Sequence, residues 1–235
     1  MRATTKMKAV LGALLLFPLV LLAAETGYRL DRSPHDPTDQ VSLQAGARTF
    51  VNYCLGCHGL QYMRYNRLRD LGLTEAQIRD NLMFTAEKVG ETMKTPMTVK
   101  EGKLWFGVPP PDLSVVARSR GADWLYSYLR TFYRDPKAAS GWNNQVFPNV
   151  AMPHALWTLQ GERRLEDGKL VQASQGAQSS AVYDATARDL VNFLVYVGEP
   201  SALDRKAWGI WTLFVLGILF IFAWLLKREY WKDVK

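Results

Sequence analysis

The stretch Cys54-Leu55-Gly56-Cys57-His58 holds both cysteines of the 235-residue chain and one of its three histidines. Two thiols three positions apart are consistent with a strained disulfide, a redox pair or a haem attachment site. A redox pair needs no histidine after its second cysteine, and zinc would need four ligands from a chain with only these two cysteines. On one helical turn the two thiols are spaced to reach the two vinyl groups of a haem. The motif therefore predicts one covalent haem c with His58 as an axial ligand.

A helix is expected to lead into this motif. Leu43, Ala47 and Phe50 precede Cys54 at helical spacing, so we predict a helix that begins near Val41 and runs into the cysteines. The attachment site would then sit at the end of a core helix.

Three further helices are predicted after the motif. Thr74 and Gln77 form the sequence of a capping box and predict a second helix. Apolar spacing predicts a helix over 123–133, and a capping pattern at Thr186 predicts another that ends at Gly198. The domain is therefore expected to be mostly α.

Long loops are expected between these helices. Residues 90–111 carry glycine and four prolines without periodicity and are predicted to be a long ordered loop, and 134–160 a second one. Within the polar segment 161–180, residues 165–170 resemble a two-residue hairpin turn between short strands. The hairpin should be a small surface excursion.

The amino end has the pattern of a secretory signal peptide. A basic lead over residues 1–8 precedes an apolar run from Ala9 to Ala24 that ends in small residues, with cleavage expected after Ala24. The alternative, a first transmembrane helix, is disfavoured because the run is short and Pro18 interrupts it. The haem domain is thus predicted to be exported and to span 25–206.

The carboxy end carries a predicted membrane anchor. Residues 207–226 are twenty positions without a charge, which as a helix span about 30 Å, the thickness of a hydrocarbon core. A buried core helix is the alternative. Basic residues dominate the tail 227–235, so the positive-inside rule places this tail in the cytoplasm. The two topology signals agree.

Charge gives no support for nucleic-acid binding. The chain has a net charge of +7, and removal of the predicted signal peptide with Arg2, Lys6 and Lys8 lowers it to +4. The tail contributes another +2, which leaves about +2 on the exported domain. The basic balance is therefore mainly a topology signal.

The second axial ligand is left open by the residues alone. The methionines after the motif are Met63, Met83, Met93, Met97 and Met152, and His154 follows the last of them. Met63 is too close to the motif to reach the opposite face, and core packing explains most methionines. Met152 and Met97 adjoin prolines in predicted loops and are the stronger candidates, with His154 or no ligand as alternatives.

Several separated stretches together resemble one family, the cytochromes c1, which are haem subunits of quinol:cytochrome c oxidoreductases. They occur in the family's order over the whole predicted mature chain. The stretches are Cys54-Leu-Gly-Cys57-His58, Pro110-Pro-Asp-Leu-Ser114, Arg118-Ser-Arg120, Asn144-Gln-Val-Phe147-Pro148, Ala151-Met152-Pro153, Glu199-Pro200 and the carboxy-terminal anchor. The resemblance implies a cytochrome c-like haem domain with one transmembrane helix.

The resemblance also implies roles for single residues. Met152 matches the family's sixth ligand, so the haem iron would have His/Met ligation. Arg120 matches an arginine that pairs with a haem propionate, and Trp124 stands beside it where the family tends to have tyrosine. Arg118 could hold this role instead, and a solvated surface arginine is the alternative for Arg120.

The turn Pro109-Pro110-Pro111 resembles the family segment that lines the His58 side of the haem, which makes Pro111 a candidate cofactor-binding residue. A backbone carbonyl of this turn could accept the free ring N–H of His58. Two departures stand out. The segment 148–152 is shorter than in mitochondrial relatives, and no long acidic run is present. The resemblance therefore extends to the ligand Met152 but not to an acidic docking surface for the acceptor.

The implied function is electron transfer without catalytic residues, so the subunit would not be an enzyme on its own. It would accept electrons from a Rieske iron–sulfur protein and pass them to a soluble or membrane-tethered cytochrome c. Cytochrome b and the Rieske protein would be fixed partners in a dimeric complex, with membrane lipid around the anchor. The haem domain would face the periplasm at a bacterial inner membrane.

Two other functions fit part of the sequence. A stand-alone tethered cytochrome shares the haem and the anchor, and isolation without cytochrome b would identify it. A haem peroxidase needs an open coordination position and usually a distal acid–base group. His154 is the one candidate for that group and adjoins the proposed ligand. Strong peroxide turnover would favour the peroxidase.

Overall fold

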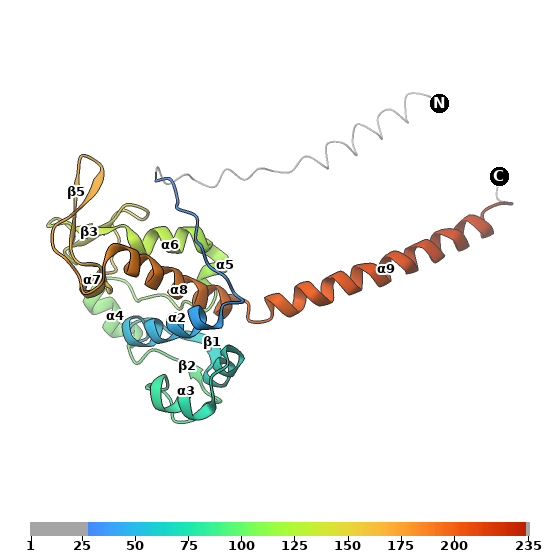
Figure 1. The fold of residues 1–235 in the computed structure, drawn as a ribbon, viewed down its shortest axis with the longest axis horizontal. Coiled ribbons are helices and arrows are strands. Elements are labelled where there is room, and N and C mark those ends of the chain that lie inside the picture. The colour runs from blue at the N-terminus through green and yellow to red at the C-terminus, as the bar shows by residue number, and fades with distance from the viewer. Residues whose placement is uncertain (1–27, 234–235) are drawn as a thin grey trace.

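Two long helices from opposite ends of the domain form its centre, α2 (Gln40–Tyr53) and α8 (Ser180–Gly198). Figure 1 shows this computed structural model, which describes residues 28–233. A Cβ atom added at Gly46 would lie 2.0 Å from the backbone oxygen of Asp189. Only glycine permits so close an approach of the two backbones. The helix predicted to lead into the cysteine motif is confirmed.

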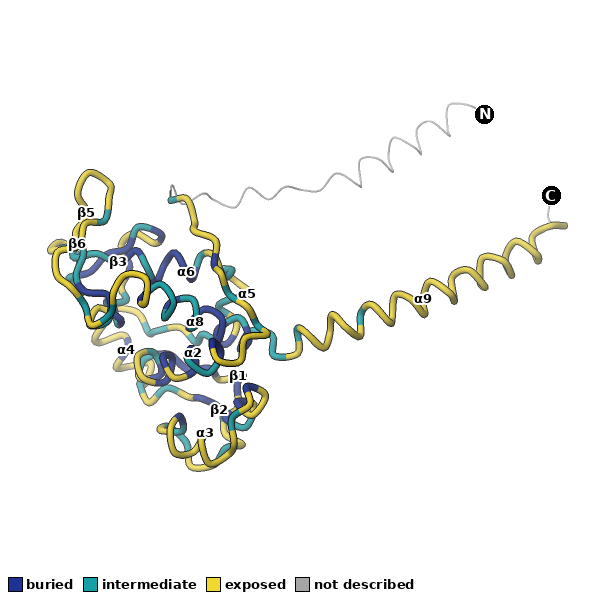
Figure 2. Tube along the Cα trace, in the orientation of Figure 1, coloured by how far each residue is buried: buried dark blue, intermediate teal, exposed yellow. Residues whose placement is uncertain are grey.

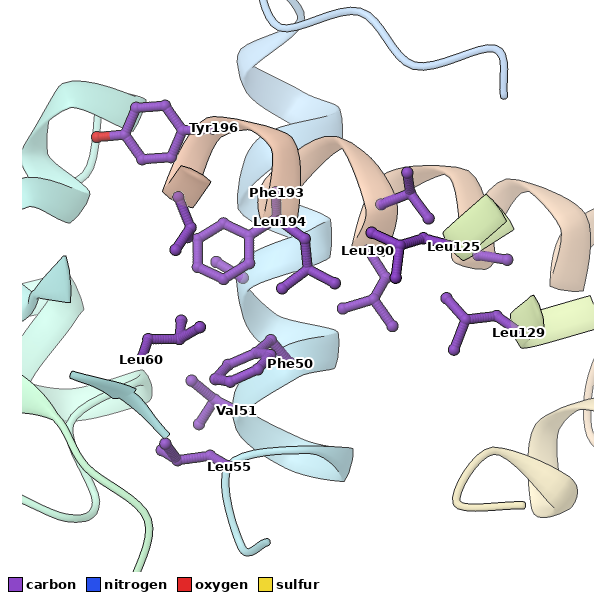
Figure 3. Close-up of a cluster of buried hydrophobic side chains, with 14 of the residues drawn as sticks. Phe50, Val51, Leu55, Leu60, Leu125, Leu129, Leu190, Phe193, Leu194 and Tyr196 are labelled. Carbon is purple, nitrogen blue, oxygen red and sulfur yellow. The ribbon is translucent and has the colours of Figure 1, made fainter. Parts of the chain in front are cut away.

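The hydrophobic core is built on these two helices (Figures 2 and 3). Phe50 of α2 and Phe193 of α8 are fully buried, with ring centroids 5.8 Å apart. Leu60 joins them from the segment after the motif, and Leu125 and Leu129 join from a neighbouring helix. Because Leu55 is also buried, the cysteine motif is attached directly to the core.

A small lobe follows the motif. Strand β1 (Leu60–Arg64) leads into the 3-10 helix η1 (Tyr65–Leu71) and then into α3 (Glu75–Asn81). The predicted capping box of α3 is present, since the Thr74 side chain accepts from the N–H of Gln77. Strand β2 (Thr92–Met93) returns to pair antiparallel with β1.

The prediction of a loop over 90–111 is wrong for 92–93, which form β2, and for 99–106. Residues Val99–Phe106 form helix α4, capped by Thr98 and Glu101 in a second capping box. The helix ends at Gly107, which has a φ of 77°. The prolines that suggested a loop lie outside α4, where they bound the helix without interrupting it.

The helix predicted over 123–133 is present but shorter. It forms α6 (Ala122–Arg130), preceded by α5 (Val116–Arg120), which the sequence interpretation missed. The chain leaves the helix after Arg130 because Phe132–Arg134 forms strand β3.

The predicted loop 134–160 also contains regular structure. Strand β4 (Trp142–Asn144) pairs antiparallel with β3, with Phe132 opposite Asn144. A short helix, α7 (Trp157–Gln160), closes the segment. The loop prediction is therefore wrong for Arg134, for 142–144 and for 157–160, whereas 135–141 and 145–156 are irregular as predicted.

The predicted hairpin is confirmed. Strands β5 (Arg163–Glu166) and β6 (Lys169–Gln172) pair antiparallel across a two-residue turn. Asp167 and Gly168 have φ values of 48° and 77°, the two positive angles that a tight hairpin turn of this kind requires. The hairpin projects from the domain surface (Figure 1).

Helix α8 begins earlier than the capping pattern at Thr186 suggested. Its N-cap is Ser179, whose hydroxyl accepts from the N–H of Val182. The Thr186 hydroxyl instead donates to the carbonyl of Val182 inside the helix. A threonine with a downstream acid therefore resembled a cap although it lies within a continuing helix.

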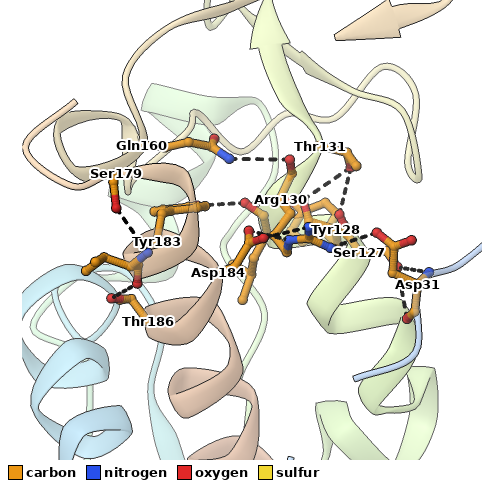
Figure 4. A network of polar contacts seen from close by, with 12 residues as sticks. Asp31, Ser127, Tyr128, Arg130, Thr131, Gln160, Ser179, Tyr183, Asp184 and Thr186 are labelled. Carbon is orange, nitrogen blue, oxygen red and sulfur yellow. Dashed lines mark hydrogen bonds and ion pairs between the residues drawn. The ribbon is translucent and has the colours of Figure 1, made fainter. Parts of the chain in front are cut away.

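Helix α6 is fixed to α8 and to the amino-terminal segment by Arg130 (Figure 4). Its guanidinium binds Asp184 through two contacts, of 2.6 and 2.9 Å, and Asp31 at 2.7 Å. The hydroxyl of Tyr183 donates to the carbonyl of Leu129 at 2.8 Å. These contacts set the position of α6 and of the side chains that it presents.

The carboxy-terminal helix α9 (Ala202–Tyr230) projects away from the domain (Figures 1 and 2). Its 29 residues include a window with a mean hydropathy of 2.4, none of it buried. The predicted anchor 207–226 lies within this membrane-length helix. At its base, Glu199 pairs with Arg205 and, at 3.5 Å, with Arg118 of α5. The predicted signal peptide, residues 1–24, lies outside the described residues.

Candidate cofactor site

The cysteine motif continues from α2 as a tight turn. The N–H of Cys54 donates to the carbonyl of Phe50 at 2.8 Å, which is the last bond of the helix. The N–H groups of Cys57 and His58 then both donate to the carbonyl of Cys54, at 3.0 and 2.8 Å. This turn brings both thiols and the His58 ring to one crevice.

Neither thiol is activated for exchange chemistry. Both cysteines are free, and burial raises the pKa of Cys54 to about 12, with a smaller contribution from Cys57. Burial also raises the pKa of Cys57. A redox or nucleophilic cysteine needs a lowered pKa, so this environment favours attachment of a group over thiol exchange.

The ring of His58 is oriented by a backbone oxygen. Its Nδ1 lies 2.7 Å from the carbonyl oxygen of Pro111. As the donor in this bond, Nδ1 leaves Nε2 with the free lone pair that a metal requires. Burial lowers the pKa of His58, opposed by the Pro111 bond and the charge of Asp112. The neutral, ligating form of the imidazole is therefore favoured.

The Pro-Pro-Asp-Leu-Ser stretch is attached to the chain after the motif by hydrogen bonds. The Asp112 carboxylate accepts from the N–H groups of Gln61 and Ser114, both at 2.9 Å. The Ser114 hydroxyl accepts from the N–H of Tyr62 at 3.1 Å. These contacts fix the Pro111 carbonyl opposite His58, a role that sequence reasoning did not give to Asp112 or Ser114.

The crevice itself is apolar and open on one side. Its space free of protein atoms is ≈ 570 Å³, including the part that opens to solvent. Helix α4 contributes Phe106, which sequence reasoning missed because it placed this segment in a loop. The lining residues are Tyr53, Cys54, Cys57, His58, Phe106, Val108, Pro109, Pro110, Pro111, Ala151, Met152, Pro153 and Ala155.

Met152 is the thioether in this lining, and its loop is held by two buried asparagines of β4. Asn144 accepts from the N–H groups of Val146 and Phe147 at 2.9 and 3.1 Å. Asn143 accepts from the N–H of Asn149 at 2.8 Å, where the chain turns with a φ of 61°. The loop therefore returns to the crevice in a fixed conformation.

The other candidate ligands lie elsewhere. Met63 and Met93 are fully buried in the core, and Met83 packs against it. The sulfur of Met97 lies 3.6 Å from the Cβ position of Gly102 on α4, and Met97 is not part of the crevice lining.

His154 is engaged by packing. Its ring stacks on Phe132 at 4.7 Å, and its Nε2 lies 2.7 Å from the side-chain oxygen of Gln160. Burial lowers the pKa of His154 to about 4, and its hydrogen bond to Gln160 opposes this shift. His154 is thus a neutral core residue outside the crevice lining.

Arg118, Arg120 and Trp124 are also outside the lining. Arg118 pairs with Glu199, whereas Arg120 has no ion pair within residues 28–233. The Arg120 guanidinium lies over the Trp124 ring at 5.1 Å, and Trp124 stacks on Tyr128 at 4.8 Å. Arg120 therefore keeps its hydrogen-bond donors free for an anionic group next to this aromatic stack.

The residues present fit a covalent haem. Two free thiols, an imidazole oriented by a carbonyl and a thioether line one apolar crevice. The thiols match the two attachment points of a c-type haem, and the imidazole and thioether match its histidine and methionine ligands.

Comparison with known proteins also supports a covalent haem site. Residues 31–234 match the model of the cytochrome C1 family. The chain is 50% identical to a Nitrosomonas europaea protein named ammonia monooxygenase gamma subunit, over 97% of this chain and 98% of that protein. It is 48% identical to cytochrome c1 of Allochromatium vinosum, over 94% of this chain and 96% of that one.

Proposed function

Because the chain belongs to the cytochrome c1 family, we propose that it accepts electrons from a Rieske iron–sulfur protein and passes them to a cytochrome c. Its membership makes it an electron-transfer subunit of respiratory complex III, the quinol:cytochrome c oxidoreductase. In the proposal the subunit has no catalytic residues of its own, since it makes and breaks no bonds of a substrate.

Members of this family carry one covalent haem c, and Cys54 and Cys57 are its attachment points here. When bound, this haem supplies reversible one-electron chemistry. In the proposal, His58 would hold the iron through Nε2, with its ring oriented by the Pro111 carbonyl, and Met152 would supply the second protein ligand. The weak thioether donor favours ferrous iron and gives a high potential.

The observation that carries the proposal is the gathering of two thiols, an imidazole and a thioether in one crevice. Cys54, Cys57, His58 and Met152 all line it, whereas Met97 and His154 lie outside its lining. Arg120 is proposed to pair with a haem propionate, with Trp124 holding its guanidinium by a cation–π contact. The ion pair of Arg118 with Glu199 makes Arg118 the weaker candidate for this role.

The proposed topology is a single pass through the inner membrane. After removal of residues 1–24, the haem domain, 25–206, would face the periplasm. The anchor 207–226 would cross the bilayer, and the basic tail 227–235 would remain in the cytoplasm. The exposed apolar surface of α9 supports contact with lipid and with cytochrome b. Two copies of the subunit are expected in a dimeric complex.

Purification in mild detergent tests this assignment. We expect an affinity tag after Lys235 to recover cytochrome b and the Rieske protein with the haem subunit, and a haem stain to mark the subunit after denaturation. A tagged chain without α9 is the control and should recover neither partner. Recovery of the full-length subunit alone, with its haem, would instead identify a stand-alone tethered cytochrome.

A further inference from the structure

We propose that the hydroxyl of Tyr128 tunes the haem potential by donating a hydrogen bond to the sulfur of Met152. This inference deepens the proposed function and rests on it, because it requires Met152 at the iron. The Tyr128 hydroxyl donates to Met152 Sδ at a distance of 3.3 Å. Met152 Sδ is the one hydrogen-bond partner of the Tyr128 hydroxyl within residues 28–233.

The tyrosine ring is held so that its hydroxyl faces the sulfur. It stacks on Trp124 with centroids 4.8 Å apart and planes 11° apart, and it meets the edge of Phe132 at 5.0 Å. The carbonyl of Tyr128 accepts from the side chain of Asn144 at 2.8 Å. Since Asn144 also holds the loop that leads to Met152, one residue fixes both partners of the bond.

The helix that carries Tyr128 is itself immobilised. Arg130, two residues further along α6, binds Asp184 of α8 and Asp31 of the amino-terminal segment. A rotation of α6 that moved the hydroxyl away from the sulfur would break these ion pairs (Figure 4). The contact is therefore built into the fold and does not depend on one side-chain rotamer alone.

The chemistry follows from the electron pairs of the thioether. The sulfur has two lone pairs, so it can donate one to iron and accept the Tyr128 proton with the other. A hydrogen bond to a ligand atom withdraws electron density from it, and hydrogen bonding around the ligands is one of the means by which a protein sets a haem potential. Ferric iron needs that density more than ferrous iron does. The bond therefore favours the reduced haem and raises the potential.

Replacement of Tyr128 by phenylalanine tests the effect of the hydroxyl separately from that of the ring. The Tyr128→Phe variant keeps both aromatic contacts and loses only the donor. In the intact complex, we expect the equilibrium constant for reduction of the haem to fall about threefold, which is about 28 mV at ~59 mV per decade for one electron. The near-infrared absorption of the sulfur–iron bond should persist at a shifted wavelength, because the ligand stays in place.

Tyr126→Phe is the matched control. Tyr126 is also buried on α6, two residues earlier and therefore on another face, where it contacts Arg130. This variant should leave both the potential and the sulfur–iron absorption unchanged. A Tyr128→Phe potential equal to that of the parent would overturn the inference, as would an equal fall in Tyr126→Phe.

A second variant distinguishes failure of this inference from failure of the ligand assignment. Met152→Leu should abolish the sulfur–iron absorption in the same preparation. If the absorption persists in Met152→Leu, another sulfur is the ligand, and both the assignment and the inference are wrong. If it disappears while Tyr128→Phe keeps the parent potential, the assignment stands and the inference alone is wrong.

Discussion

Replacing Met152 with lysine should lower the midpoint potential of the haem by roughly 200 mV or more, since axial ligands set haem potentials over a range of ≈ 0.8 V. An amine is a stronger donor than a thioether and stabilises ferric iron. At ~59 mV per decade, this loss shifts the equilibrium with an electron donor by more than about a thousandfold. Quinol oxidation by the complex should stall, while Cys54 and Cys57 keep the haem attached.

Redox titration and a covalent-haem stain of the same preparation test both halves of this prediction. Met97→Lys is the matched control, because Met97 lies outside the crevice lining and carries the same substitution. Its potential should stay within a few millivolts of the parent. An unchanged potential in Met152→Lys together with a large drop in Met97→Lys would move the ligand to Met97.

Replacing Asn144 with alanine should destabilise the domain on the order of 3–5 kcal/mol and detach the Met152 sulfur from iron. The side chain is fully buried and bonds to the N–H groups of Val146 and Phe147 and the carbonyl of Tyr128. Each buried group left without a partner costs about 1–3 kcal/mol. The sulfur–iron absorption should weaken strongly at room temperature, and thermal unfolding should begin at a lower temperature.

Gln145→Ala is the control for this variant. Gln145 is the next residue and makes one side-chain hydrogen bond, to the carbonyl of Gly168 in the surface hairpin. Its replacement should change neither the absorption nor the unfolding temperature by a measurable amount. Equal stability of the Asn144→Ala and Gln145→Ala variants would contradict the role given to Asn144.

Local patterns in the sequence predicted the elements that depend on neighbouring residues. The spacing of Leu43, Ala47 and Phe50 correctly placed the helix before the motif, and the Asp167-Gly168 turn correctly placed the hairpin. The Thr98 and Glu101 capping box is an equally local signal for α4. The loop prediction rested on the prolines, which lie outside the helix, and did not use this capping box.

The remaining errors concern contacts between distant segments. Strands β3 and β4 have three residues each, too few for an alternating pattern to be recognised, and their pairing exists only in the folded chain. That pairing ends α6 at Arg130 and places Asn144 beside Tyr128. The contact of Tyr128 with Met152 depends on this arrangement, so no spacing in the sequence could have revealed it.

The crevice residues also divide into those that a local motif reveals and those that only contacts between distant segments reveal. The sequence identified Cys54, Cys57 and His58 through a local motif, and it left Met152 and Met97 as open alternatives. The choice between these two methionines required the fold. The fold brings the Met152 loop to the crevice and leaves Met97 against α4. Asp112 is a similar case, because its bonds to Gln61 and Ser114 hold in place the segment whose Pro111 carbonyl orients His58.

The rate of haem reduction in the complex tests the central claim, that this subunit receives its electrons from a Rieske protein. Purified oxidised complex would be mixed rapidly with quinol and the haem c absorption followed, before and after selective removal of the Rieske protein. We predict fast reduction in the intact complex, and a rate at least about a hundredfold lower without the Rieske protein that recovers when it is added back. Equal rates in both preparations would contradict the account.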